Sequence, residues 1–244
     1  YSGLIEDPDQ PLFFRAIGGE YPSGSTFKPF IAYAAMAEGI VGEHTSFLST
    51  GGLRIGQWFF PDWKAGGHGV TDVRKAIAES VNTYFYIIGG GYDTVAGLGV
   101  ERIADYAGRF GFGAPTGIDL PSESEGFLPS KMWKEDAKGE RWYVGDTYHL
   151  AIGQGDFLTT PLQMASATAI IANGGNKVVP YVVETADGFG TQAPEHTAPV
   201  PLKDLDAYAL EVVRQGMRQT ITIGSARSLS DLASAVAGKT GTAQ

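Results

Sequence analysis

Helical patterns that stop at glycine recur along this chain and limit it to short helices joined by tight turns. Glycine occurs 34 times in 244 residues, and it adopts the left-handed conformation that ends many helices without steric penalty. Apolar spacing and capping residues predict helices over 26–38, 72–78, 82–88, 100–110, 161–172 and 205–220. Strand-like composition is confined to 177–184, where Pro180 indicates an edge or bulge, and to the small-residue run 233–243. The sequence therefore predicts an α+β chain dominated by helix.

The remaining stretches are predicted to be loops around one core. Gly, Pro, Asp and Ser are concentrated at 42–70, 113–147 and 185–203, and no interdomain linker stands out. Hydrophobic residues make up 43% of the chain and charged residues 18%, which is ordinary for a globular protein. We therefore expect one domain.

Charge and cysteine content exclude several classes of function. The net charge of −9 argues against nucleic acid as a partner, because phosphate binding requires clustered Lys and Arg. The absence of cysteine excludes disulfides, thiolate catalysis and cysteine-ligated zinc. No apolar run approaches the length that spans a bilayer, so any export signal or anchor is expected upstream of Tyr1.

Ser25 and Lys28 form an S-x-x-K pattern at the start of the first predicted helix. At this spacing the lysine can reach the serine hydroxyl. A serine hydroxyl needs an adjacent base to become a nucleophile, and a desolvated lysine can supply one. A helix-capping serine followed by a solvated lysine is the alternative, and these two residues alone do not decide between them.

Two further short patterns follow in the chain. Ser80-Val81-Asn82 gives S-x-N, and Lys239-Thr240-Gly241 gives K-T-G. Taken singly, the first is equally explained as a polar turn between helices and the second as an exposed strand lysine.

In this order, the three motifs resemble the signature set of penicillin-binding proteins and serine β-lactamases. YPSGSTFKPF is similar to the nucleophile segment of class B penicillin-binding proteins. ESVNTYFY, TGIDLPSESEGFLPSKMWK, GDTYHLAIGQGDFLTTPLQMA and GSARSL…AGKTGTAQ resemble blocks of the elongation-type transpeptidases, the penicillin-binding protein 2 group. The resemblance runs from about Asp9 to Gln244 and implies the serine β-lactamase/penicillin-binding-protein transpeptidase-like fold.

The resemblance implies acyl transfer on the D-Ala-D-Ala end of a peptidoglycan stem peptide. Ser25 would attack the penultimate D-Ala carbonyl, and an amine from a neighbouring strand would then take the acyl group. Lys28 is the implied base, Ser80 the proton relay to the leaving group, and Asn82 the residue that orients the substrate amide or Lys28.

The K-T-G segment is implied to bind the substrate. Lys239 would place positive charge near Ser80 and the substrate carboxylate, which Thr240 and Thr242 would hydrogen-bond. The backbone N–H groups of Ser25 and Thr242 would form the oxyanion hole, and Gly241 would let the substrate backbone pass closely.

The resemblance also implies partners and a location. β-Lactam antibiotics would acylate Ser25, and a glycan polymerase and elongation-complex membrane proteins are expected partners; no cofactor is expected. The expected location is the extracytoplasmic (periplasmic) face of the bacterial cytoplasmic membrane, with the anchor in a segment outside these residues.

The chain departs from the family pattern at both ends. In the family, the K-T-G strand is followed by further strands and a helix, and an anchor, a pedestal and early strands precede the nucleophile. Residues 1–244 are therefore expected to be a partial transpeptidase domain, the helical half plus the K-T-G strand. Because a lone strand leaves its backbone groups unpaired, these residues alone are expected to fold poorly or lack activity.

A structural zinc lies near the D-W-K…G-H-G loop in some members of the penicillin-binding protein 2 group. Asp62 and His68 match two ligand-type positions, but no cysteine is present. We therefore expect a loop Asp and His without metal.

Other enzyme classes fit less well. Residues 233–240 resemble a permissive P-loop, but Gly241-Thr242-Ala243 is a poor start for the helix that a P-loop requires. G-x-G-x-x-G and G-x-S-x-G do not occur, nor does the E-x-x-L-N pattern of a class A β-lactamase between Asn82 and Lys239. A penicillin-binding sensor or non-catalytic binding domain of the same fold remains the alternative.

Overall fold

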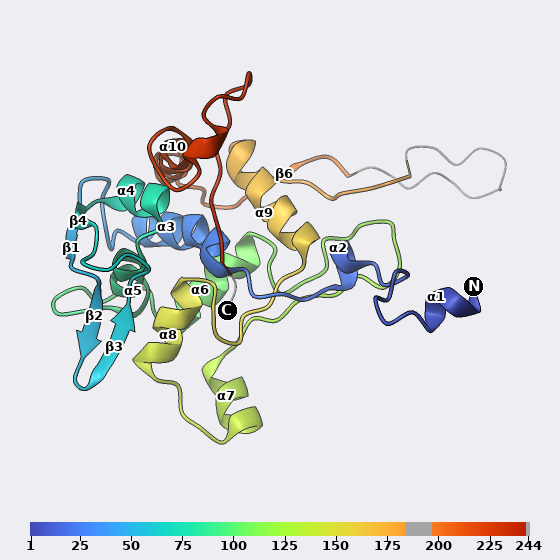
Figure 1. The fold of residues 1–244 in the computed structure, drawn as a ribbon, viewed down its shortest axis with the longest axis horizontal. Helices are drawn as coiled ribbons and strands as arrows, with labels where there is room; N and C mark the ends of the chain where they lie inside the picture. Colours follow the sequence, from blue (N-terminus) through green and yellow to red (C-terminus); the bar gives the residue numbers. More distant parts are fainter. Residues whose placement is uncertain (184–196, 243–244) are drawn as a thin grey trace.

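The computed structural model describes residues 1–183 and 197–242 of the protein. Helices are the main regular structure of this part, with small two-stranded sheets beside them (Figure 1). None of its helices is both long and apolar enough to cross a membrane. In chain order the elements are α1 (Ser2–Ile5), α2 (Arg15–Gly18), η1 (Gly24–Phe27), α3 (Lys28–Ala37), β1 (Phe47–Ser49), β2 (Gly52–Ile55), β3 (Trp58–Pro61), β4 (Gly69–Thr71), α4 (Val73–Glu79), α5 (Asn82–Gly90), α6 (Gly99–Arg109), α7 (Lys131–Lys138), α8 (Val144–Ala151), α9 (Pro161–Ala172), β5 (Asn176–Lys177), β6 (Val200–Pro201), α10 (Ala207–Thr222) and η2 (Arg227–Leu229).

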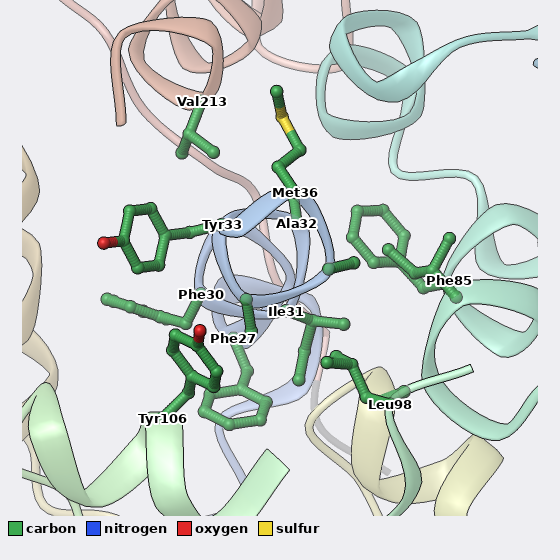
Figure 2. Packing of buried hydrophobic residues seen from close by; sticks show 14 of the residues in the cluster. Phe27, Phe30, Ile31, Ala32, Tyr33, Met36, Phe85, Leu98, Tyr106 and Val213 are labelled. Atoms are coloured by element: carbon green, nitrogen blue, oxygen red, sulfur yellow. The ribbon is translucent and has the colours of Figure 1, made fainter. Parts of the chain in front are cut away.

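Helix α3 lies at the centre of the core. Nine of its ten residues are buried, and a helix that is apolar on every side is stable only when enclosed. It contacts α4, α5, α6 and α10. Figure 2 shows its side chains pointing outward around the helix axis, with Phe85 of α5, Tyr106 of α6 and Val213 of α10 nearby. The helix that begins at Lys28 is therefore held from several sides.

The connection between α4 and α5 is held by packing on both of its helices. Helix α4 packs on α10, where a Cβ added at Gly216 would lie 3.0 Å from the Cβ of Ile77. Helix α5 packs equally closely on α8, because a Cβ added at Gly89 would lie 2.4 Å from the Cβ of Ala151. Both glycines allow a close approach that any side chain would prevent.

All six predicted helices are present, with ends that move by a few residues. Prediction and structure agree at 161–172, where the Thr160 side chain accepts from the Gln163 N–H and the Gln163 side chain accepts from the Thr160 N–H. The first predicted helix starts two residues late, because residues 24–27 form a 3₁₀ turn before α3 begins.

The loop predicted at 42–70 is wrong. It contains β1, β2, β3 and the start of β4, with β1 antiparallel to β4 and β2 antiparallel to β3. Phe47 lies opposite Thr71, and Gly52 lies opposite Pro61. These strands have three or four residues each, so they carry too little alternation of apolar and polar residues to be recognised.

The loop predicted at 113–147 is also wrong, because it contains α7 and the start of α8. The Ser130 hydroxyl accepts from the Trp133 N–H at 3.1 Å and caps α7, and Gly139 ends the helix with a φ of 67°. Seven of the helix's eight residues are at least partly exposed. A short polar helix lacks the apolar stripe from which the other helices were predicted.

The two predicted strands are largely absent. Residues 233–242 have no regular secondary structure, and no strand of the described residues lies beside them to share a hydrogen-bond ladder. In 177–183, only Lys177 is in a strand; β5 pairs with β6, which lies in the loop predicted at 185–203. Residues 178–183 are irregular, and 184–196 lie outside the described residues.

Candidate active site

Ser25 lies in the 3₁₀ turn that leads into the buried helix α3, one turn before Lys28. The preceding Gly24 has a φ of 55°, and a Cβ there would lie 2.4 Å from the backbone oxygen of Thr242. The Gly24 N–H also donates to the Gly153 carbonyl at 2.8 Å. The 3₁₀ turn that carries Ser25 therefore packs directly against the K-T-G segment on one side and the loop after α8 on the other.

The Lys28 side chain is completely buried and joins the first two motifs. Its Nζ lies 2.6 Å from Asn82 Oδ1, 2.8 Å from the Ser80 carbonyl oxygen and 3.2 Å from Ser80 Oγ. In the described part of the chain, no hydrogen bond joins Lys28 to the Ser25 hydroxyl. The structure therefore places the amine against the S-x-N turn, whereas the S-x-x-K spacing alone indicated contact with Ser25.

Burial of this amine favours its neutral form. Burial lowers the pKa of Lys28 well below its ordinary value, the charge of Lys239 lowers it further, and the charge of Asp62 opposes both. A neutral amine has two N–H donors and one lone pair. The Ser80 carbonyl and Asn82 Oδ1 are acceptors and take both donors. The lone pair then remains available to receive a proton from a hydroxyl.

The backbone of Ser80 adopts an uncommon conformation. It ends α4 with φ 60° and ψ 43°, in the left-handed region, and only 8% of the residue is exposed. Few residues other than Gly, Asn and Asp adopt this conformation readily, and it costs about 1–2 kcal/mol for an ordinary residue. The packing of α4 and α5 on either side holds it there.

The K-T-G segment is fixed by side chains outside the motif. Gln154 donates from Nε2 to the Thr242 carbonyl at 2.9 Å, and Ser225 Oγ lies 2.7 Å from Thr240 Oγ1. A Cβ added at Gly241 would lie 2.8 Å from Thr26 Cγ2, so this glycine allows the segment to approach η1. Gln154 and Ser225 lie in the blocks AIGQGDF and GSARSL, but nothing in their sequence context indicated a role.

Six of the eight predicted site residues line one cleft of about 380 Å³. They are Ser25, Ser80, Asn82, Thr240, Gly241 and Thr242, and Trp63, Ile152, Gln154 and Ser225 complete the walls. Residues of all three motifs thus converge on one cleft, as the resemblance implied.

Lys28 and Lys239 are the two predicted residues that do not line the cleft. Lys28 lies beneath it, in contact with Ser80 and Asn82. Lys239 lines a smaller cavity of about 140 Å³ beside α3, α9 and α10. Its Nζ donates to the Thr240 carbonyl at 2.8 Å, and burial lowers its pKa to about 7.

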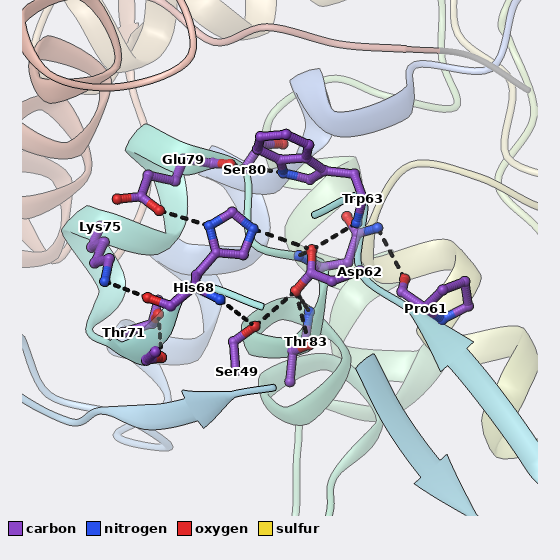
Figure 3. Close-up of polar contacts among 12 residues, drawn as sticks. Ser49, Pro61, Asp62, Trp63, His68, Thr71, Lys75, Glu79, Ser80 and Thr83 are labelled. Atoms are coloured by element: carbon purple, nitrogen blue, oxygen red, sulfur yellow. Dashed lines mark hydrogen bonds and ion pairs between the residues drawn. The ribbon is translucent and has the colours of Figure 1, made fainter. Parts of the chain in front are cut away.

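Asp62 and His68, the two ligand-type residues, take part in a hydrogen-bond network (Figure 3). His68 Nδ1 lies 2.6 Å from Glu79 Oε2, and its Nε2 lies 3.7 Å from Asp62 Oδ1. The two carboxylates face different ring nitrogens and do not converge on one point. No group of three His, Asp or Glu side chains in the described residues could hold a metal ion. The residues present therefore do not fit a zinc site.

Comparisons with known proteins agree with this geometry. The family described as "Penicillin binding protein transpeptidase domain" matches residues 3–244. A "Peptidoglycan D,D-transpeptidase MrdA" of Acinetobacter baumannii is 40% identical over 100% of this chain and 36% of its own length. The chain thus spans little more than a third of that relative.

Two solved structures are also similar. Pseudomonas aeruginosa PBP2 in complex with WCK 5153 has a TM-score of 0.89 at 35% identity, over 100% of this chain and 55% of the other. Helicobacter pylori PBP2 in complex with MreC has a TM-score of 0.85 at 32% identity, over 100% of this chain and 44% of the other.

Proposed function

This chain belongs to the penicillin-binding protein transpeptidase domain family, and from that premise we propose that it is the serine acyl-transfer site of a peptidoglycan D,D-transpeptidase. The observation that supports this most is the convergence of Ser25, Ser80, Asn82 and the K-T-G backbone on one cleft above the buried amine of Lys28. Residues 1–244 would form part of a single transpeptidase domain within a longer protein.

The first step forms the acyl-enzyme. The Ser25 hydroxyl attacks the carbonyl carbon between the two terminal D-Ala residues, and its proton passes to the neutral amine of Lys28. The C–N bond then breaks, and the terminal D-Ala leaves as an amine after receiving a proton through the Ser80 hydroxyl. Because Ser80 Oγ lies 3.2 Å from Lys28 Nζ, one hydrogen bond links the base to the hydroxyl that would protonate the leaving group.

The K-T-G segment would stabilise the charges. The N–H groups of Ser25 and Thr242 face the developing oxyanion, and loss of one such donor typically lowers the rate by about 10²–10³. Thr240 and Thr242 would hydrogen-bond the terminal carboxylate of the substrate. Lys239 would add positive charge behind them, since it lies next to Thr240 and on the far side of the segment from the cleft.

The second step transfers the acyl group to an amine. An acceptor stem peptide approaches the ester, Lys28 takes a proton from its amine, and the new amide releases Ser25. We propose that the same ester forms with β-lactams, whose ring amide stands in for the D-Ala-D-Ala bond.

Partners and location follow from the same proposal. MreC is the partner in the Helicobacter pylori complex, and we propose that this chain works with elongation-complex membrane proteins and a glycan polymerase. The substrate lies outside the cytoplasmic membrane, so we place the domain on that face. The upstream anchor remains a prediction.

A cross-linking assay tests the proposal. The full-length protein is incubated with a stem peptide ending in D-Ala-D-Ala and a labelled amine acceptor, and the products are identified by mass. The proposal predicts one released D-Ala per cross-link, with both products lost in Ser25→Ala. Acylation without any cross-link would favour a penicillin-binding sensor instead.

A further inference from the structure

We propose that Asp62 is a positioning residue for acylation of Ser25, because it holds the start of α5 and thereby orients the Asn82 amide toward Lys28. This inference rests on the proposed function. Asp62 follows β3, outside the three motifs, and it reaches the S-x-N turn from a segment about twenty residues away in sequence.

Asp62 supplies the cap that α5 lacks. The N-cap residue, Val81, has no polar side chain and makes no capping hydrogen bond. Asp62 Oδ1 accepts from the Asn82 N–H at 3.0 Å, and Oδ2 accepts from the Thr83 N–H at 3.1 Å and Thr83 Oγ1 at 2.8 Å. The carboxylate is fully buried, and its negative charge is favourable at a helix N-terminus.

The same segment fixes which way the Asn82 amide points. Asn82 Nδ2 donates to the Pro61 carbonyl at 3.4 Å, while Oδ1 accepts from Lys28 at 2.6 Å. A flipped amide would turn its NH₂ group toward an amine that is also a donor. Pro61 and Asp62 therefore hold both the backbone and the side chain of Asn82 in the orientation that Lys28 needs.

The Asp62 charge also acts on the base. It raises the pKa of Lys28, against the larger effect of burial and the effect of Lys239. Asp62 therefore affects Lys28 both through the position of Asn82 and through its own charge, although its side chain makes no hydrogen bond to Ser25 or Lys28.

The test uses the near-isosteric Asp62→Asn variant of the full-length protein. Acylation by benzylpenicillin is followed at increasing concentration, which separates the limiting acylation rate from the dissociation constant of the non-covalent complex. We expect the limiting rate to fall about tenfold to a hundredfold, as misplacement of a catalytic group does. The dissociation constant is expected to change little, because Asn82 stays in the cleft.

Ser49→Ala is the matched control. Ser49 Oγ donates to Asp62 Oδ2 at 3.2 Å and accepts from the His68 N–H, and neither of these hydrogen bonds involves α5. We expect this variant to lose thermal stability and to keep its limiting acylation rate. Equal losses of rate in both variants would overturn the inference, because general weakening of the loop would then explain them.

A double variant separates positioning from a structural role. If Asp62 acts through Asn82, Asp62→Asn is expected to slow acylation far less in an Asn82→Ala background than in the wild type. The same factor in both backgrounds would contradict the inference.

Should Asp62→Asn not fold, Asp62→Glu keeps the charge and displaces the carboxylate. A lower limiting rate of acylation is then expected, and a wild-type rate would contradict the inference. A wild-type protein that is not acylated at all would contradict the proposed function itself.

Discussion

Lys28 Nζ lies 2.6 Å from Asn82 Oδ1, at the base of the cleft and across 54 residues of sequence. This contact ties α3, which follows the turn that carries Ser25, to the first residue of α5. Burial around it lowers the pKa of Lys28, which favours the neutral amine that a general base requires.

Replacement of Lys28 by Met tests the role of the amine. Met has a similar length and suits a buried site, so we expect the fold to persist by circular dichroism. The rate of acylation by benzylpenicillin is expected to fall about 10²–10⁴-fold, the contribution of a general base. Lys28→Arg is the comparison, because arginine carries a positive charge and cannot lose its proton. Substantial acylation in either variant would contradict a base at this position.

The two lysines predict a pH dependence of stability. Burial lowers the pKa of Lys239 to about 7 and lowers that of Lys28. Above the lowered pKa values the unfolded chain binds more protons than the folded one, so the free energy of unfolding rises with pH. We expect urea unfolding to show this rise from about pH 7 to pH 10, with a smaller slope in Lys239→Met. A fall in stability over this range would contradict it.

Ser80 allows the hydroxyl to be separated from the backbone. Its φ of 60° is strained for Ala but not for Gly. Ser80→Ala and Ser80→Gly both lose the proton relay, and we expect both to slow acylation. Ser80→Gly is expected to be more stable than Ser80→Ala by about 1 kcal/mol, measured by thermal unfolding. Equal stabilities would show that the left-handed backbone is not retained.

Alanine substitutions at Gly24 and Gly39 test whether the backbone of the turn that carries Ser25 must pack closely on Thr242. Gly24 and Gly39 have φ values of 55° and 67°, but only at Gly24 would a Cβ meet another segment, the Thr242 backbone. Both alanine variants are expected to lose about 1 kcal/mol of stability through backbone strain. Only Gly24→Ala is expected to lose most of its acylation rate, since it displaces Thr242 from Ser25. Similar rates in the two variants would contradict this.

The sequence was most informative where short-range signals suffice. The ends of α9 could be predicted because Thr160 and Gln163 form a capping box within the chain segment itself. Helix α7 could not, because its polar residues give no apolar stripe, although Ser130 and Gly139 mark its ends. The strand predicted at 233–243 depends on neighbours that a sequence pattern cannot supply.

The site shows the same division. The motifs identified the residue types that carry acyl transfer, and their order led to one cleft. The residues that hold them were missed, because Asp62, Gln154 and Ser225 act through contacts between distant segments. Backbone carbonyls and N–H groups, which accept or donate many of these bonds, leave no signal in residue identity.

Intact-protein mass after incubation with benzylpenicillin shows whether Ser25 is the acylated nucleophile. The full-length protein and its Ser25→Ala variant are compared, and both are first shown to be folded by circular dichroism. We predict a stable added mass of one penicillin on the wild-type protein and none on the variant. A folded wild-type protein without the adduct, or a variant that still carries it, would contradict Ser25 as the acylated nucleophile.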